Sequence, residues 1–163
     1  MKYLTLIILV AMVACSPKSE LVMSYNIDAN NVIDRHITTL DNTYTSDDNG
    51  SIKIDSDSSQ VIKLYETGDI DLENCQVIYE AMLKTKKLIG TTYLEMWCVF
   101  GDQKFFSRAL NKQVGGSNDW QKISTPFLLK KGQNPDNIEL NLVVDGVGTV
   151  WIDNIKLKKV KLE

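Results

Sequence analysis

Apolar and polar residues alternate in short runs along most of this 163-residue chain. In residues 139–144, Leu140, Leu142 and Val144 share one parity, as expected for a strand with one buried face. No segment after the first fifteen residues carries an apolar stripe of helical period. Comparable runs occupy residues 51–54, 60–66, 77–84, 93–100, 104–110, 127–129 and 150–157. This pattern predicts an all-β fold, an antiparallel β-sandwich or jelly roll.

Glycine-containing segments separate these runs. Residues 145–149, with the sequence DGVGT, supply the positive φ angles that a tight hairpin needs. The runs before and after them are therefore predicted to pair with each other as a hairpin. A basic segment that ends at Gly90 predicts another turn, between the runs at 77–84 and 93–100.

The parity of three runs indicates which side chains face solvent. Burying a carboxylate without a partner costs several kcal/mol, so the parity that carries Glu80, Glu95 and Arg108 is predicted to face outward. Aromatic rings stack on the C–H faces of a pyranose, and carboxylate and guanidinium groups bind its hydroxyls. We therefore expect a carbohydrate site, the structural alternative being paired surface charges beside aromatic side chains. The outward parity also carries Tyr93, Trp97, Met82 and Phe106.

Charge and motif content narrow the classes of function. A net charge of −3 and a pI of about 5.2, without a basic stripe, argue against nucleic-acid binding. The single histidine, His36, and the absence of hydrolase, metalloprotease and P-loop motifs argue against an enzyme. A glycosidase pair formed by Glu80 and Glu95 would need a cleft that a chain of this size does not indicate.

The N-terminal residues have the pattern of a targeting segment. Residues 1–14 are predicted to be a signal peptide, with an apolar region too short to span a membrane. The segment that ends at Cys15 resembles the lipobox of bacterial lipoproteins, an ordinary secretory signal being the alternative. That resemblance implies a lipidated Cys15 and attachment to the cell envelope at the outer membrane. The residues that follow predict a tether over 15–24 and, from a length that is too short for two domains, a single domain over 25–163.

Two cysteines remain after Cys15. Cys75 and Cys98 share the parity of the apolar residues in their runs, so both are predicted to point inward. A disulfide between them and two buried free thiols are both compatible with the sequence.

The order of features from residue 119 to 157 resembles carbohydrate-binding modules of the family 4/9/22 kind. It runs from an Asp-Trp pair through an apolar strand, a polar loop and an alternating strand to G-x-G and VWIDNIKL. The resemblance implies a galactose-binding-like jelly roll. It also implies that Asp153 is a side-chain ligand of a structural calcium ion, with carbonyl groups from residues 49–51. The alternative is that Asp153 accepts hydrogen bonds from backbone amides at a strand bulge.

Together these observations predict non-catalytic carbohydrate binding by a membrane-anchored lipoprotein. The alternative is a structural or protein-interaction lipoprotein that docks onto an envelope protein and has no sugar ligand.

Overall fold

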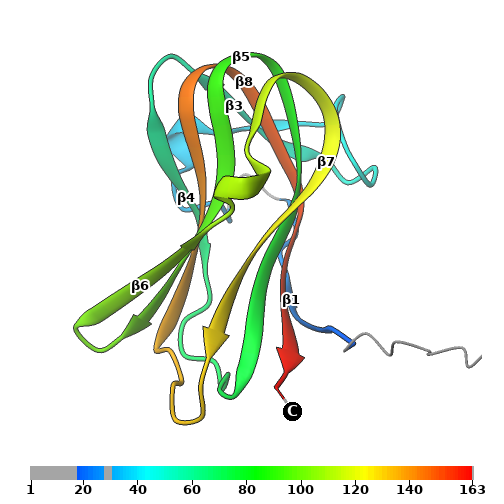
Figure 1. Ribbon diagram of the computed structural model, residues 1–163. Helices are drawn as coiled ribbons and strands as arrows, with labels where there is room; N and C mark the ends of the chain where they lie inside the picture. The colour runs from blue at the N-terminus through cyan, green and yellow to red at the C-terminus, as the bar shows by residue number, and fades with distance from the viewer. Residues whose placement is uncertain (1–17, 28–30, 163) are drawn as a thin grey trace, which may run out of the picture.

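The computed structural model of the chain describes residues 18–27 and 31–162. Within these ranges the regular structure is eight strands and two short 3-10 turns, and no helix is long and apolar enough to cross a membrane (Figure 1). The elements are β1 (Glu20–Ser24), η1 (Arg35–Ile37), β2 (Thr39–Asp41), β3 (Ser51–Ser56), β4 (Gln60–Glu66), β5 (Cys75–Phe100), β6 (Gln103–Arg108), η2 (Leu110–Lys112), β7 (Val114–Leu129) and β8 (Asn137–Lys161).

The two longest strands, β5 and β8, each run through both layers of a sandwich. Residues 75–86 of β5 pair with β7 on one side and with residues 149–161 of β8 on the other. Residues 89–99 of β5 pair with β6 and with residues 137–147 of β8. Between these halves both strands arch over the top of the molecule (Figure 1). One folded-over sheet therefore supplies both layers.

We name the layers after their edge strands. The β7 layer contains β7, the first half of β5, the second half of β8, and then β1 and β3, with β2 beyond β3. The β6 layer contains β6, the second half of β5, the first half of β8 and β4. Every pairing is antiparallel, which confirms the predicted antiparallel β-sandwich.

The predicted hairpin at residues 145–149 is wrong. These residues continue β8 and, with residues 86–91 of β5, form the crease where the sheet folds over. A Cβ atom on Gly90 would lie 2.0 Å from the carbonyl oxygen of Asp145, and one on Gly146 would lie 2.0 Å from that of Ile89. The glycines thus permit close approach of two paired backbones rather than a turn. The turn predicted to end at Gly90 is wrong for the same reason.

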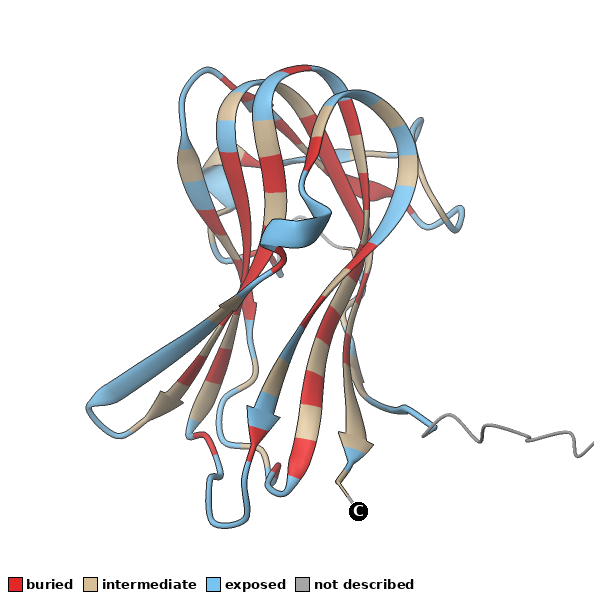
Figure 2. Cartoon of the chain, viewed as in Figure 1, coloured by how far each residue is buried: buried red, intermediate tan, exposed pale blue. Residues whose placement is uncertain are grey.

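The core lies between the layers and follows the predicted parity. Tyr79 and Leu83 from the β7 layer and Leu94 and Met96 from the β6 layer are fully buried. Figure 2 shows buried positions alternating with more exposed ones along both arms of β5. A single cluster of buried apolar residues joins the two layers.

Cys75 and Cys98 both point into this core, and they are free thiols. Burial raises the pKa of Cys98 to about 12 and also raises the pKa of Cys75. Both groups are therefore protonated near neutral pH, as structural rather than reactive cysteines are.

The predicted tether over residues 15–24 is wrong in its second half. Glu20–Ser24 forms β1, which pairs with residues 156–159 of β8. The sheet therefore begins before residue 25. The predicted signal peptide over 1–14 and the lipidation site at Cys15 lie outside the described residues.

Candidate functional site

The outer face of the β6 layer gathers five of the seven predicted ligand-binding residues. Tyr93, Glu95 and Trp97 project from β5, and Phe106 and Arg108 project from β6. Trp97 pairs with Phe106 and Glu95 pairs with Arg108, so the two strands present the same side at these positions. The parity predicted from the sequence is right for the direction of these side chains but wrong for their exposure, because Glu95 is buried and β6 is exposed on both parities.

Strand register extends this face across β8 and β4. Lys63 and Asn141 lie in the same cross-strand row as Glu95, although the sequence interpretation did not select them. The sequence could have indicated Asn141, because it has the outward parity in the run at residues 139–144. From the crease outward, the rows are Val61–Val143–Tyr93, Lys63–Asn141–Glu95–Arg108, Glu66–Glu139–Trp97–Phe106 and Asn137–Val99–Lys104.

Glu95 is the buried centre of this face, with an exposed fraction of 2%. Its Oε1 accepts hydrogen bonds from Trp97 Nε1 at 2.7 Å and from Asn141 Nδ2 at 3.0 Å. Its Oε2 accepts one from Arg108 Nε at 2.6 Å. The carboxylate therefore fixes the indole ring and the guanidinium group from below, and it is too deeply covered to meet a ligand directly.

The electrostatics of Glu95 agree with this role. Burial alone would raise its pKa, but the hydrogen bonds from Asn141, Trp97 and Arg108 outweigh burial and hold the pKa below its usual value. Glu95 is thus ionised at neutral pH, and its charge is matched by that of Arg108.

The aromatic part of the face is the Trp97–Phe106–Arg108 cluster. The ring centroids of Trp97 and Phe106 lie 5.1 Å apart with planes tilted by 53°. The Arg108 guanidinium lies 4.5 Å from the Phe106 centroid, in cation–π geometry. Phe106 is 52% exposed, and the Arg108 side chain is 37% exposed. The cluster therefore presents apolar ring surface and hydrogen-bond donors side by side.

Tyr93 lies nearer the crease on the same face. It lines an open hollow of about 360 Å³ together with Gln60, Val61 and Val143. Four residues of strand separate it from Trp97, a distance of roughly 13 Å. The face is therefore long enough for more than one sugar ring.

Charges on this face balance. Lys63 bonds to Glu66 at 2.9 Å and to Glu139 at 3.2 Å, while Lys104 reaches Glu139 at 2.9 Å. With the Glu95–Arg108 pair, three basic groups therefore face three carboxylates. A face of this kind suits an uncharged ligand.

The prediction that Glu80 and Met82 belong with this cluster is wrong. They project from the other half of β5, on the outer face of the β7 layer, where Glu80 bonds to Lys158 at 2.6 Å and faces Lys122 at 3.7 Å. The crease between the two halves turns them onto the opposite side of the sandwich. Glu80 and Glu95 therefore do not flank a common site.

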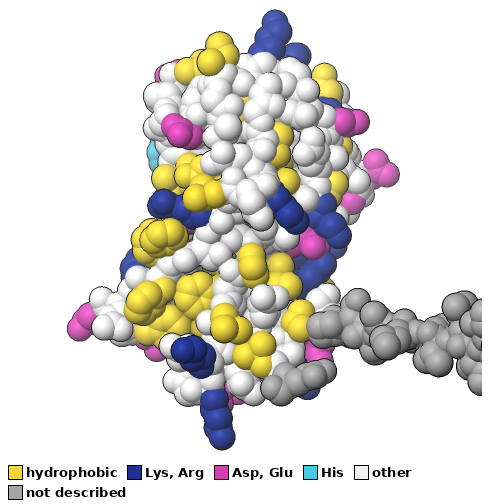
Figure 3. All heavy atoms as spheres, in the orientation of Figure 1, with side chains coloured by type: hydrophobic (Ala, Val, Ile, Leu, Met, Phe, Trp, Pro, Cys, Tyr) yellow, Lys and Arg dark blue, Asp and Glu magenta, His cyan; other side chains and the backbone are white. Residues whose placement is uncertain are grey.

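Apolar side chains also gather near β6 and β7 in the lower half of the face seen in Figure 3. Phe105, on the inward parity of β6, is 50% exposed and packs edge-on against Phe100 at 6.0 Å. Phe105 and Phe106 are thus exposed to a similar degree, but their side chains project from opposite sides of β6.

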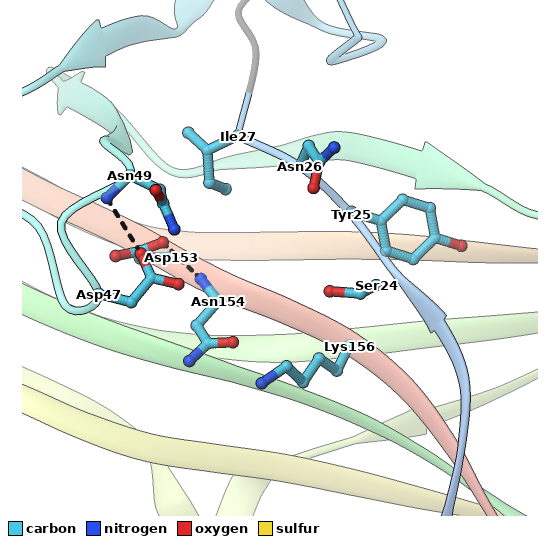
Figure 4. Close-up of a pocket in the computed structure, with 9 residues that line it drawn as sticks. All are labelled: Ser24, Tyr25, Asn26, Ile27, Asp47, Asn49, Asp153, Asn154 and Lys156. Carbon is cyan, nitrogen blue, oxygen red and sulfur yellow. Dashed lines mark hydrogen bonds between the residues drawn. The ribbon is translucent and has the colours of Figure 1, made fainter.

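Asp153 is fully buried beside a hollow of about 450 Å³ (Figure 4). Its Oδ2 accepts a hydrogen bond from Ser46 N at 2.6 Å, and its Oδ1 accepts one from Asn154 N at 2.6 Å. Asn154 has a φ of 52°, next to a register shift between β5 and β8. Asp47 and Asn49 also line the hollow. Asp153 therefore ties the loop before β3 to β8.

Acidic side chains do not by themselves form a calcium site around Asp153. No group of three or more His, Cys, Asp or Glu residues within 18–27 and 31–162 could hold a metal ion. Lys156 lines the same hollow and adds a positive charge. Two acidic residues nearer the N-terminus could have supplied a further ligand: Asp34 instead accepts a hydrogen bond from Lys63 N at 2.7 Å, and Asp28 lies outside the described residues. The amide contacts of Asp153 match the alternative, and calcium binding stays a prediction.

Replacing Asp153 with alanine tests both roles. We expect the free energy of unfolding to fall by about 2 to 4 kcal/mol, because two amides lose a charged acceptor. Denaturant unfolding measures this loss. If Asp153 only accepts these amide hydrogen bonds, the melting temperature of the native protein will be the same with EDTA and with calcium chloride. A calcium-dependent rise that disappears in Asp153→Ala would instead establish the cation site.

Searches against protein-family models and against curated proteins find no match. Solved structures do match. The xylan-binding CBM22-1 domain of Xyn10C from Paenibacillus barcinonensis aligns with a TM-score of 0.55 and 13% identity, over 77% of this chain and 82% of that one. A family 61 module in complex with β-1,4-galactotriose aligns with a TM-score of 0.53 and 12% identity, over 76% and 83%.

A further match is the CBM22-1–GH10 structure of xylanase 10B from Clostridium thermocellum, complexed with xylohexaose. It aligns with a TM-score of 0.54 and 14% identity over 77% of this chain, which spans only 25% of that longer chain. At these identities the likeness establishes the fold: the chain has the β-sandwich of carbohydrate-binding modules, as the resemblance in its sequence implied.

Proposed function

We propose that this protein binds carbohydrate, without catalysis, on the outer face of the β6 layer. The observation that carries the proposal is the Trp97–Phe106–Arg108 cluster, held in place by the buried carboxylate of Glu95. A sugar ring would stack on exposed aromatic surface, and the terminal nitrogens of Arg108 would donate to its hydroxyls. Tyr93 would provide a second contact further along the face.

The charge balance of the face and the matched structures support a neutral glycan. Three carboxylates offset three basic groups, so an uncharged ligand meets no net field there. Two of the matched modules were solved with a xylan-type or galactan-type oligosaccharide. The experiment below therefore begins with neutral β-linked glycans.

We expect Phe106→Ala to weaken glycan binding at least about tenfold, because it removes exposed ring surface from the cluster. The measurement is a glycan array with the purified protein, followed by calorimetric titration of the bound glycans. Phe105→Ala is the matched control, since Phe105 is equally exposed but points to the other side of β6. Equal losses in the two variants, or no bound glycan with folded protein, would contradict the proposal.

We also propose that the domain is held at the bacterial envelope by a lipid on Cys15. The support is the sequence pattern that ends at this residue. Metabolic labelling with a fatty-acid analogue should mark the native protein and not Cys15→Ser. Labelling of neither protein would contradict lipidation of Cys15.

A further inference from the structure

Two further hollows lie on the outer face of the β7 layer, next to the crease. They measure about 360 and 380 Å³, and they share Tyr44, Lys86 and Trp151. These residues come from the loop after β2, from β5 and from β8. The location is separate from the Trp97–Phe106–Arg108 cluster, which faces out from the other layer.

An aromatic wall divides the two hollows. Trp151 is 2% exposed, and its Nε1 donates to Asp41 Oδ2 at 2.8 Å. Tyr44 covers it, with ring centroids 5.1 Å apart, and remains 42% exposed. Asp41 Oδ1 accepts the backbone N–H groups of Thr43 at 2.8 Å and of Tyr44 at 3.2 Å. Asp41 therefore fixes the tryptophan and the loop that carries the tyrosine.

The charge around this wall is positive. Two aspartates and four lysines line the hollows, in a chain whose net charge is −3. Lys53 is paired with Asp55 at 2.6 Å, and Lys84 with Asp119 at 2.7 Å. No ion pair within the described residues involves Lys86 or the fourth lysine, Lys87. Two cationic side chains are thus available to an anion, and Figure 3 shows basic side chains projecting at the top of the molecule, near the crease.

Polar groups beside the lysines suit a sugar rather than a bare anion. Ser117 and Asn118 line one hollow, and Thr149 lines the other. The exposed Tyr44 ring between them offers a stacking surface. A nucleic acid would need a longer basic track than these four lysines provide.

We propose that these hollows form a second carbohydrate subsite, selective for a sugar that carries a carboxylate or sulfate group. The anionic group lies between Lys86 and Lys87, and the sugar ring lies against Tyr44. This inference rests on the proposed function only in taking the ligand to be a glycan. Since the two sites lie on opposite outer faces, one molecule would hold two separate glycan segments, one neutral and one acidic.

The test compares two double variants that remove the same charge. Lys86→Gln/Lys87→Gln should weaken binding of oligogalacturonate about tenfold or more, because charge-assisted hydrogen bonds are lost. Lys130→Gln/Lys131→Gln changes two exposed lysines in the loop between β7 and β8 and should leave the affinity unchanged. Tyr44→Ala should weaken binding as well. Calorimetric titration at low and moderate salt measures each affinity.

Several outcomes would overturn the inference. If both double variants lose affinity for oligogalacturonate equally, the lysines attract the anion non-specifically. An unchanged affinity in Tyr44→Ala would lead to the same conclusion. Binding to vesicles of anionic lipid with no binding to oligogalacturonate would assign the lysines to a membrane surface. Phe106→Ala separates the two proposals. It should weaken neutral-glycan binding at least about tenfold and leave oligogalacturonate binding intact, so each proposal can be contradicted without the other.

Discussion

Replacing Gly146 with alanine is expected to prevent stable folding, at a cost of about 4 kcal/mol or more. The new Cβ would lie 2.0 Å from the carbonyl oxygen of Ile89 and 2.9 Å from the Cα atom of Gly90. Both are backbone atoms of the paired strand, so relief requires β5 and β8 to separate at the crease. That separation would disturb both layers, because both strands continue into each of them. Soluble yield and denaturant unfolding measure the effect.

Two other glycines provide the control for this substitution. Gly101 and Gly132 have φ values of 54° and 80°, and a Cβ atom added at either position would meet no atom within 4 Å. Alanine at either place should cost only about 1 to 2 kcal/mol, the penalty of a left-handed conformation. If Gly146→Ala unfolds at the same denaturant concentration as Gly132→Ala, close backbone approach at the crease does not limit stability.

Replacing Glu95 with alanine is expected to lower the free energy of unfolding by about 2 to 4 kcal/mol. The substitution leaves Asn141 Nδ2 and Trp97 Nε1 without their acceptor. Loss of the ion pair with Arg108 contributes less to this fall in the free energy of unfolding, since the Arg108 side chain is partly exposed and stays hydrated. Glycan binding should weaken too, because the indole and the guanidinium lose their common anchor. Glu66→Ala, on the exposed rim of the same face, should cost less than about 1 kcal/mol.

The same carboxylate predicts a pH dependence. Its folded pKa is depressed below the unfolded value of about 4.3, so its stabilisation is complete above that pH and is lost as pH falls through the folded pKa. The stability difference between the native protein and Glu95→Gln should therefore shrink on acidification below about pH 4. Denaturant titrations at several pH values measure it, and a constant difference would contradict the assignment.

The outward faces were predictable because parity is a local property of a strand. Glu95 and Trp97 stand two residues apart on β5, so any reading of that run places them on one side. Parity carries no information across a sharp bend, and this is why Glu80 was assigned to the wrong face. The error began at Gly90, since a tight turn and a crease between paired strands both require glycine.

The burial of Glu95 was beyond the reach of the sequence. It depends on Asn141, which lies 46 positions further along the chain and meets Glu95 only through the register of β5 with β8. The hollows around Tyr44 and Trp151 depend in the same way on a loop crossing the outer face of the β7 layer. The sequence pattern identifies residues that can belong to such sites, but the pairing of distant strands and the path of the loops decide which of these residues come into contact.

The central place of β8 has a consequence for how the protein is made. This strand is the partner of β1, β3, β4 and β5, yet it leaves the ribosome after all of them. Among the described strands, β1 and β4 have no partner until it emerges, and only the pairs of β5 with β6 and β7, and of β2 with β3, are open to the nascent chain. We therefore expect the two layers to form only once residues 137–161 have left the ribosome, with the earlier strands held until then as separate, incomplete pairs.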